Sequence, residues 1–230
     1  MIHTNHDKKI NILTKNFKNG KQINMDVTKT KSKNKIIKNL MPNTNSSTIK
    51  VQKRDGRLES LDINKIHFVV EEACEGLTGV SSSQIEMNAN IQFYDGMTTK
   101  DIQNVLVRSA NDLISLDAPN YQYAAARLLS YDVRKEAHGQ YEYIPLLKLI
   151  LRNIRLGVYD KGILDKYTKT ELKKFNTWIR RDRDLKFTYA GLRQICDKYL
   201  VQDRSSGQIY ETPQDMYMMI AATLFAEYPT

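Results

Sequence analysis

Short apolar stretches on either side of a turn signal predict a β-hairpin near residue 50. Asp55 and Gly56 form a pair that tolerates positive φ, which suits a two-residue turn between strands at 49–53 and 57–61. Asp62 then stands where a helix N-cap would stand. The apolar residues that follow it recur at helical spacing: Ile63, Ile66, Val69, Val70, Ala73 and Leu77. The pattern therefore predicts a hairpin followed directly by an amphipathic helix.

Three more helices are expected before residue 140. Ser81 and Gln84 stand at capping-box spacing and predict a short helix that runs to about residue 90. Thr98 and Asp101 repeat that arrangement ahead of a helix with apolar positions between 102 and 114. The segment 117–119 opens a long helix, which Gly139 is expected to end.

The second half of the chain also carries a mainly helical pattern. Helices are expected at about 145–156, 168–179 and 189–199, the second one preceded by a capping box between Thr168 and Glu171. A hairpin is expected between segments 199–203 and 208–211, and Thr212 with Pro213 begins a final apolar helix. No segment alternates strands and helices as a catalytic α/β barrel would.

Charge divides the chain into a basic tail and a neutral body. The formal net charge is +9, and residues 1–50 carry all of it, because they hold 11 lysines, two aspartates and no arginine. The remainder has 24 basic and 24 acidic residues, which argues against a nucleic-acid partner for the folded body. The tail lacks a sustained apolar period, so we expect it to be disordered and dispensable for ligand binding. The expected domains are 1–47, 48–139 and 140–230.

Few residues offer catalytic or metal-binding chemistry. Cys74 and Cys196 are too far apart in sequence for a local metal or redox motif, and the four histidines have no metal-ligand spacing. No phosphate-binding glycine loop is present, so any nucleotide would be held by side chains such as Lys53 and Lys65. A surface hairpin with solvated lysines is the alternative interpretation. The absence of a signal peptide, of a membrane-length apolar run and of many cysteines predicts a cytoplasmic protein.

Several blocks in order resemble one known family. They are Val51–Ile66, Ile91–Gln103, Asp117–Arg127 and Arg134–Glu142, followed by Arg183–Ala190, Lys198–Asp203 and Gly207–Pro213. Together they resemble the N-terminal region, with its ATP-cone, of the class I ribonucleotide reductase large subunit. The resemblance implies a mainly α (α+β) fold, in which a helical bundle capped by a small β-sheet is followed by a helical domain. The family's ten-stranded catalytic barrel is absent from these 230 residues.

The resemblance also implies an ATP/dATP site. The residues at the family's positions are Lys53, Glu59, Ser60, Leu61, Asp62, Ile63, Asn64, Lys65, Thr99 and Lys135. In this interpretation the three lysines face the phosphates, Thr99 adds a hydroxyl, and Glu59 and Asp62 take the sugar and base side. Mg²⁺ is expected to accompany the triphosphate. No residue is assigned a catalytic or a protein-bound metal role.

The function implied is allosteric control of ribonucleoside-diphosphate reduction, with ATP permitting and dATP suppressing activity. The implied partners are the radical-generating β subunit, further α subunits and a separate polypeptide that would supply the barrel, with no membrane. The 230 residues alone are expected to be inactive, because the family's catalytic cysteines have no counterpart among them. A free-standing ATP-cone module without catalysis, and a tail that tethers nucleic acid, are the alternatives.

Overall fold

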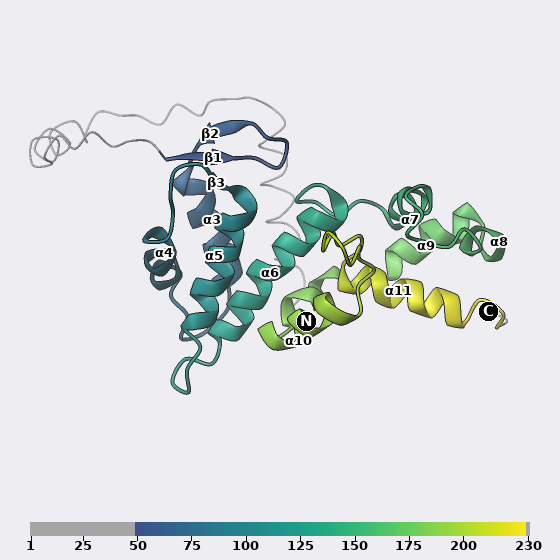
Figure 1. Ribbon diagram of the computed structural model, residues 1–230. Helices are drawn as coiled ribbons and strands as arrows, with labels where there is room; N and C mark the ends of the chain where they lie inside the picture. Colours follow the sequence, from purple (N-terminus) through teal and green to yellow (C-terminus); the bar gives the residue numbers. More distant parts are fainter. Residues whose placement is uncertain (1–48, 229–230) are drawn as a thin grey trace, which may run out of the picture. The chain divides into compact units, whose positions relative to one another are not determined.

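The computed structural model describes residues 49–228. They form nine helices and one 3-10 helix beside a small sheet, as Figure 1 shows. The basic tail predicted at 1–47 lies outside the described residues. Within 49–228 the mainly helical fold is confirmed, and no barrel is present.

The predicted hairpin is present, but its turn is longer than expected. Strands β1 (Lys50–Gln52) and β2 (Leu58–Ser60) pair antiparallel, with Val51 opposite Glu59. The Lys53 amide donates to the Arg57 carbonyl at 2.8 Å, and the Gly56 amide donates to the Lys53 carbonyl at 2.9 Å. Three residues, 54–56, therefore close the hairpin, and only Gly56 takes positive φ (+85°). The predicted two-residue turn was wrong, because a type I′ turn would require positive φ at Asp55 as well.

A third strand, which the sequence pattern did not predict, completes the sheet. Strand β3 (Met97–Thr98) pairs parallel with β1, so the order is β2-β1-β3. The Gly96 amide donates to the Lys50 carbonyl at 2.8 Å and fixes the approach of β3. The sheet thereby joins the start of one helix to the hairpin.

Four helices pack beneath this sheet: α3 (Ile63–Cys74), α4 (Ser82–Asn90), α5 (Thr99–Asp112) and α6 (Tyr121–His138). Asp62 caps α3 as predicted, with its carboxylate accepting from the Asn64 amide at 3.1 Å. Thr98 caps α5 in the same way through the Asp101 amide. Gly139 ends α6 at φ +72°, again as predicted.

The capping box predicted for α4 is only half formed. The Ser81 hydroxyl accepts from the Gln84 amide, but the Gln84 side chain does not return to the Ser81 backbone. Instead, the Tyr121 hydroxyl accepts from the Ser81 amide at 3.0 Å and donates to Gln84 Oε1 at 2.5 Å. A side chain of α6 therefore completes the start of α4 and ties the two helices together.

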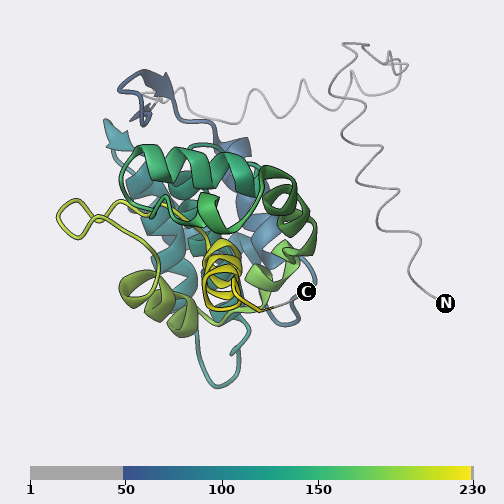
Figure 2. The ribbon, with the colours of Figure 1, turned by 90° about the vertical axis from the view of Figure 1, so that its right-hand side faces the viewer.

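The second half contains α7 (Leu146–Arg155), α8 (Ile163–Lys166), α9 (Lys169–Trp178), the 3-10 helix η1 (Arg181–Lys186), α10 (Tyr189–Lys198) and α11 (Pro213–Leu224). The predicted helices and the Thr168–Glu171 capping box are confirmed. The short α8 and η1 were not predicted. The predicted second hairpin is reduced to one bridge, between Gln202 and Ile209, and its loop projects from the body in Figure 2.

Two clusters of buried side chains hold the described residues together. The larger one lies among α3, α4, α5 and α6 and extends to Leu192 and Cys196 of α10. The smaller one gathers Leu146, Leu149 and Ile150 of α7 with Leu172 of α9. Helix α6 packs against α3, α5, α10 and η1, so it is the element that the two halves share.

Candidate nucleotide site

A pocket of about 510 Å³ lies where the hairpin meets the starts of α3 and α5 and the end of α6. It is lined by Val51, Lys53, Arg54, Asp55, Arg57, Glu59, Ser60, Leu61, Asp62, Lys65, Ile66, Val69, Thr99, Ile102, Gln103, Leu106, Lys135 and Gly139. Eight of the ten residues predicted for the site are among them. The other two, Ile63 and Asn64, do not line the pocket, and Ile63 is half exposed.

The hairpin brings three cations, Lys53, Arg54 and Arg57, and two carboxylates, Asp55 and Glu59, to the pocket. Lys53 Nζ lies 3.3 Å from Glu59 Oε2, and Arg57 lies 3.7 Å from the other oxygen of the same carboxylate. These contacts follow from the strand register, which places Glu59 across from Val51 and beside Lys53. Lys53, Arg57 and Glu59 are partly exposed, so they can exchange these contacts for contacts to a ligand.

The first turn of α3 contributes Asp62 and Lys65. Lys65 Nζ lies 3.6 Å from Asp62 Oδ2, and its side chain is 70% exposed. Thr99, the first residue of α5, lines the same pocket. Two helix N-termini therefore face this space, and their free amides favour a negatively charged ligand.

Arg54 is a pocket cation that the sequence prediction missed. Its guanidinium lies 2.7 Å from Oδ1 of Asp132, a buried residue of α6. Burial raises the pKa of Asp132, while Arg54 acts in the opposite direction. The partners are 78 residues apart in sequence. Neither local pattern nor spacing could have paired them; the only sequence signal was the position of Arg54 beside the turn.

Lys135 is the most constrained cation of the pocket. It lies in the last turn of α6, is partly buried, and makes no ion pair with any residue in 49–228. Burial lowers its pKa, and the nearby Arg54, Arg134 and Lys53 lower it further, against the opposing effect of Asp132. A crowded, partly buried cation of this kind is stabilised by an added anion.

The opposite wall of the pocket is apolar. Ile66, Val69, Ile102 and Leu106 come from α3 and α5, one or two turns below the charged rim. Gln103 lies among them and donates from Nε2 to the Leu128 carbonyl at 2.8 Å. The pocket therefore offers a cationic rim and an apolar wall, the combination that a ligand with phosphates and an aromatic base requires.

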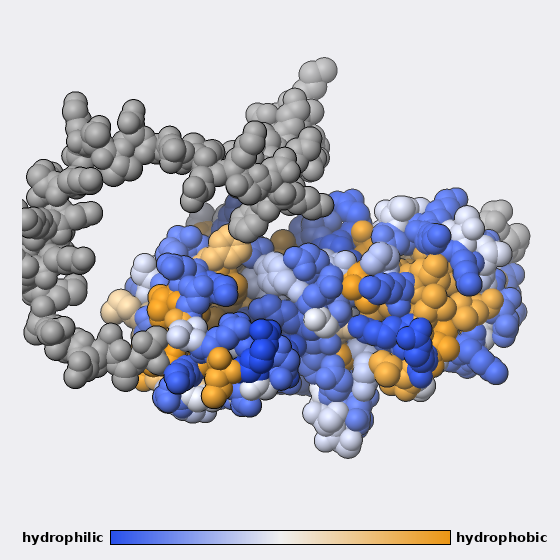
Figure 3. All heavy atoms as spheres, turned by 90° about the horizontal axis from the view of Figure 1, so that it is seen from above, coloured by the Kyte–Doolittle hydropathy of each residue, from blue (hydrophilic) through white to orange (hydrophobic). Residues whose placement is uncertain are grey.

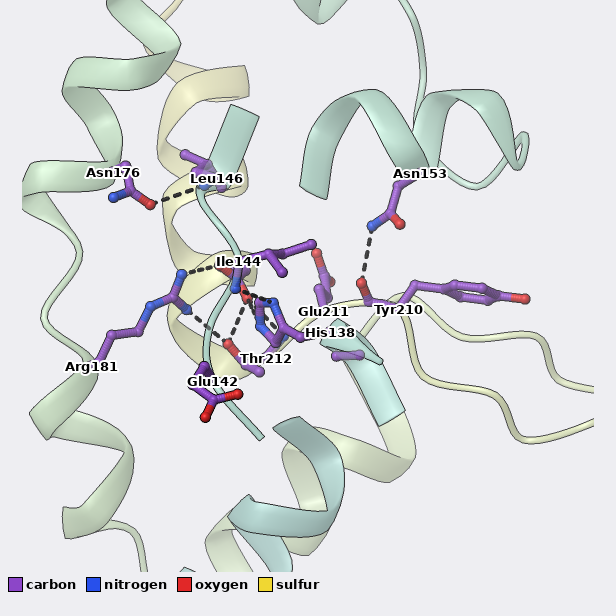
Figure 4. Close-up of polar contacts among 12 residues, drawn as sticks. His138, Glu142, Ile144, Leu146, Asn153, Asn176, Arg181, Tyr210, Glu211 and Thr212 are labelled. Atoms are coloured by element: carbon purple, nitrogen blue, oxygen red, sulfur yellow. Dashed lines mark hydrogen bonds and ion pairs between the residues drawn. The ribbon is translucent and has the colours of Figure 1, made fainter. Parts of the chain in front are cut away.

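A second cluster of charged groups lies on the other side of α6 and is buried. Figure 4 shows His138, Arg181 and Thr212 converging there. Oδ1 of Asp215 accepts from Arg181 at 2.6 Å, and Oδ2 lies 3.2 Å from His138 Nε2. Burial acts to raise the pKa of Asp215, but His138 and Arg181 outweigh it and hold the pKa below its usual value. We call these four residues the buried junction.

Other bonds join the same end of α6 to the loop before α11. The Glu136 carboxylate accepts from the Ile209 amide at 3.0 Å, and its other oxygen lies 3.3 Å from Lys100 Nζ. Asn153 of α7 donates to the Tyr210 carbonyl at 3.0 Å, as Figure 4 also shows. The last turn of α6 thus contacts the pocket through Lys135 and the second half through Glu136 and His138.

Neither cysteine is placed for redox chemistry. Burial raises the pKa of the half-buried Cys74 to about 11 and that of the buried Cys196 to about 12. Among residues 49–228, no group of three or more His, Cys, Asp or Glu side chains could hold a metal ion. Within the same residues, no helix is long and apolar enough to cross a membrane.

Two protein families match the chain. Residues 49–136 match the ATP cone domain, and residues 185–229 match the all-alpha domain of ribonucleotide reductase. The ATP cone match contains every lining residue of the pocket except Gly139. The second match begins in η1 and covers α10 and α11.

Similar proteins come from bacteria and a phage. Ribonucleoside-diphosphate reductase 1 subunit alpha of Salmonella typhimurium is 47% identical over 184 residues, which are 80% of this chain and 24% of that protein. The Escherichia coli protein of the same name is 48% identical over 78% of this chain and 24% of its own length. The alpha subunit of Enterobacteria phage T4 is 40% identical over 79% of this chain and 24% of its own length.

The chain spans about a quarter of the length of these relatives. The two family matches cover residues 49–136 and 185–229, and α7, α8 and α9 lie between them. The chain belongs to the ribonucleoside-diphosphate reductase α-subunit family, and it corresponds to the N-terminal region that carries the ATP cone.

Proposed function

We propose that the pocket binds ATP and dATP as allosteric effectors. The observation that carries this proposal is the convergence of Lys53, Lys65 and Lys135, from three separate elements, on one pocket with an apolar wall. Arg54 and Arg57 add two further cations at its rim. Phosphate groups would neutralise this charge, and the match to an ATP cone domain supports the choice of an adenine nucleotide.

In the proposed pose, the triphosphate lies along Lys53, Arg54 and Lys135, and the base lies against Ile66 and Ile102. Glu59 and Asp62 would then accept hydrogen bonds on the sugar and base side, and the Thr99 hydroxyl would reach a phosphate. Mg²⁺ would accompany the nucleotide through phosphate oxygens and water, since Mg²⁺ usually keeps several waters and few protein ligands.

We further propose that this region regulates an enzyme that reduces ribonucleoside diphosphates to deoxyribonucleoside diphosphates in the cytoplasm. ATP would permit activity, and dATP would suppress it by changing how α subunits assemble with one another and with a β subunit. The match to the all-alpha domain beyond the cone supports this over a free-standing cone module. The catalytic barrel would be supplied by further α-subunit sequence, on the same or a separate polypeptide.

Residues 49–228 would have no reductase activity of their own. Cys74 and Cys196 are the chain's two cysteines, and neither stands at a position that the family uses for its radical or redox cysteines. The folded pocket and junction would act only on the equilibrium between assembly states. Activity would return when the barrel and the β subunit are added.

Titration calorimetry of the 230-residue chain with ATP and dATP tests the site. Charge-assisted hydrogen bonds contribute about 1.5 to 3 kcal/mol each, so Lys53→Ala/Lys65→Ala should weaken binding at least tenfold. The matched control is Lys186→Ala/Lys198→Ala, two exposed lysines of the second half that do not line the pocket. Equal affinities of wild type and the Lys53/Lys65 variant would exclude the proposed site.

A further inference from the structure

A hollow on the second half of the molecule combines an apolar floor with a basic rim. It has a volume of about 430 Å³ and lies between α7 and α9, and we call it the basic groove. Its floor is formed by Pro145, Leu147 and Leu151, and its rim by Lys148, Arg155 and Lys173. Figure 3 shows hydrophobic surface flanked by hydrophilic side chains over this end of the molecule. The basic groove is distinct from the nucleotide pocket, with which it shares no residue.

The charge of the basic groove is not balanced locally. Residues 145–178 contain eight Lys or Arg and three Asp or Glu, an excess of five positive charges, although the body as a whole is neutral. Lys148, Arg155 and Lys173 form no ion pair with any residue in 49–228. Leu147 and Leu151 stay half-buried beneath them. An occupant of this surface must therefore bring both carboxylates and apolar side chains.

The chain carries a surface of the opposite character on the cone. Residues 66–95 contain five Asp or Glu and no Lys or Arg. Phe68 and Glu71 lie one turn apart on α3, and Glu75 follows directly after its last residue. Met87 lies on α4, and Ile91 follows directly after the last residue of that helix. We call these five residues the acidic patch.

The acidic patch exposes three large apolar side chains to solvent. Phe68 is 64% exposed, Met87 is 69% exposed and Ile91 is 85% exposed. His67 joins the two helices beside them, with Nδ1 2.8 Å from Glu86 and Nε2 3.1 Å from Glu71. Grouped exposed apolar side chains on a soluble domain indicate an interaction surface.

We propose that the basic groove of one copy of this chain binds the acidic patch of a second copy. Each surface supplies what the other lacks: the apolar floor receives apolar side chains, and the basic rim faces carboxylates. The two surfaces belong to separate packing groups, since α3 and α4 pack with α5 and α6, whereas α7 packs with α9. Figure 1 shows α3 and α4 at one end of the described body and α7 and α9 at the other, so the contact joins different copies.

This contact is heterologous, because two different surfaces meet. Each bound pair leaves one basic groove and one acidic patch unoccupied, so further copies can add in the same direction. Its charged rims lie at the surface, where salt screens them strongly. Association should weaken at least tenfold between about 50 mM and about 500 mM NaCl.

Sedimentation velocity on the full 230-residue chain tests the proposal through two charge reversals. The groove variant is Lys148→Glu/Arg155→Glu, and the patch variant is Glu71→Lys/Glu75→Lys. All four side chains are exposed, so circular dichroism and thermal melting should match the wild type. In about 50 mM salt the wild type should self-associate, and each variant alone should bind itself at least tenfold more weakly.

Mixing the variants gives the decisive result. An equimolar mixture offers two complementary pairings: the unchanged patch of the groove variant with the unchanged groove of the patch variant, and the acidic groove of the first with the basic patch of the second. The mixture should therefore regain the association that each variant alone has lost. Lys186→Glu/Lys198→Glu, with the same change of charge elsewhere, should associate like the wild type.

Four results would overturn the proposal. They are a wild type that stays monomeric at about 100 µM in low salt, groove and patch variants that associate normally, a mixture that remains monomeric, and loss of association on deleting residues 1–47. The last result would assign the contact to the basic tail.

Discussion

The nucleotide pocket and the buried junction use the same kinds of charged side chain and satisfy them differently. In the junction, Arg181 and His138 both reach Asp215, whose side chain is fully buried. In the pocket, Lys135 has no carboxylate partner in the described chain, and Lys65 is largely exposed. Removing a partner from a buried charge is strongly destabilising, so the charges of the junction are committed to the fold, whereas charges without partners are available to a ligand. Helix α6 contributes residues to both regions, with Lys135 in the pocket and His138 in the junction.

The largest expected effect comes from Asp215→Asn. The change leaves Arg181 and His138 without their anionic partner, and breaking a buried ion pair costs about 3 to 5 kcal/mol. The melting temperature should fall by roughly 10 °C for a domain of this size. Asp182→Asn, which removes an exposed ion pair with Arg180, is the control and should melt like the wild type. Equal melting of both variants would remove the distinction between junction and surface.

Asp184→Asn should stabilise the folded protein at neutral pH, whereas Asp215→Asn should destabilise it. Asp184 is buried, and burial raises its pKa to about 7 against the lowering effects of Gln214, Arg181 and Tyr143. A raised folded pKa means that wild-type stability is present below about pH 4 and is lost as pH rises through about 7. The variant should therefore become more stable than the wild type by an amount of the order of 3 kcal/mol above pH 7.

Urea unfolding at several pH values measures this difference. Near pH 3 both folded and unfolded Asp184 are protonated, so the pH-dependent part of the difference between wild type and variant should vanish there. A difference that stays constant from about pH 3 to pH 8 would show that Asp184 does not titrate in the folded protein.

The smallest expected effect concerns a buried carboxylate at the edge of the pocket. Asp132 lies buried in α6 but pairs with Arg54 at the pocket rim. Asp132→Asn removes a negative charge beside the phosphate-binding cations, so affinity for ATP should rise about threefold, most clearly at low salt. Asp165→Asn, at an exposed position of α8, is the control for net charge. Weaker binding would mean that Asp132 holds Arg54 in its binding position.

The sequence predicted elements whose signals are local. Asp62, Thr98 and Thr168 cap helices where their positions predicted, and Gly139 ends α6. The hairpin loop was misjudged, because Asp55-Gly56 is compatible with a two-residue and a three-residue loop. Strand β3 has only two residues, too few for a period, and exists because it pairs with β1.

The parts of the site that escaped prediction depend on long-range contacts. The lysines were identified because the chain resembles a family with cations at those positions. Arg54 with Asp132, and Tyr121 with Ser81, are partners only after α6 has packed against the rest of the cone. The junction between His138 and Asp215 likewise joins two helices that are far apart in sequence. Pairs of residues that lie so far apart leave no periodic pattern or motif in the sequence.

The last turn of α6 has a thermodynamic consequence. Lys135, Glu136 and His138 lie within about one helical turn, roughly 5 Å of axis, yet they contact the pocket, the loop before α11 and the junction respectively. A molecule bound to the second half that displaces this turn changes nucleotide affinity by some factor. The nucleotide must then change the affinity of that molecule by the same factor. A measured nucleotide dissociation constant is therefore also a gauge of what is bound on the far side of the helix.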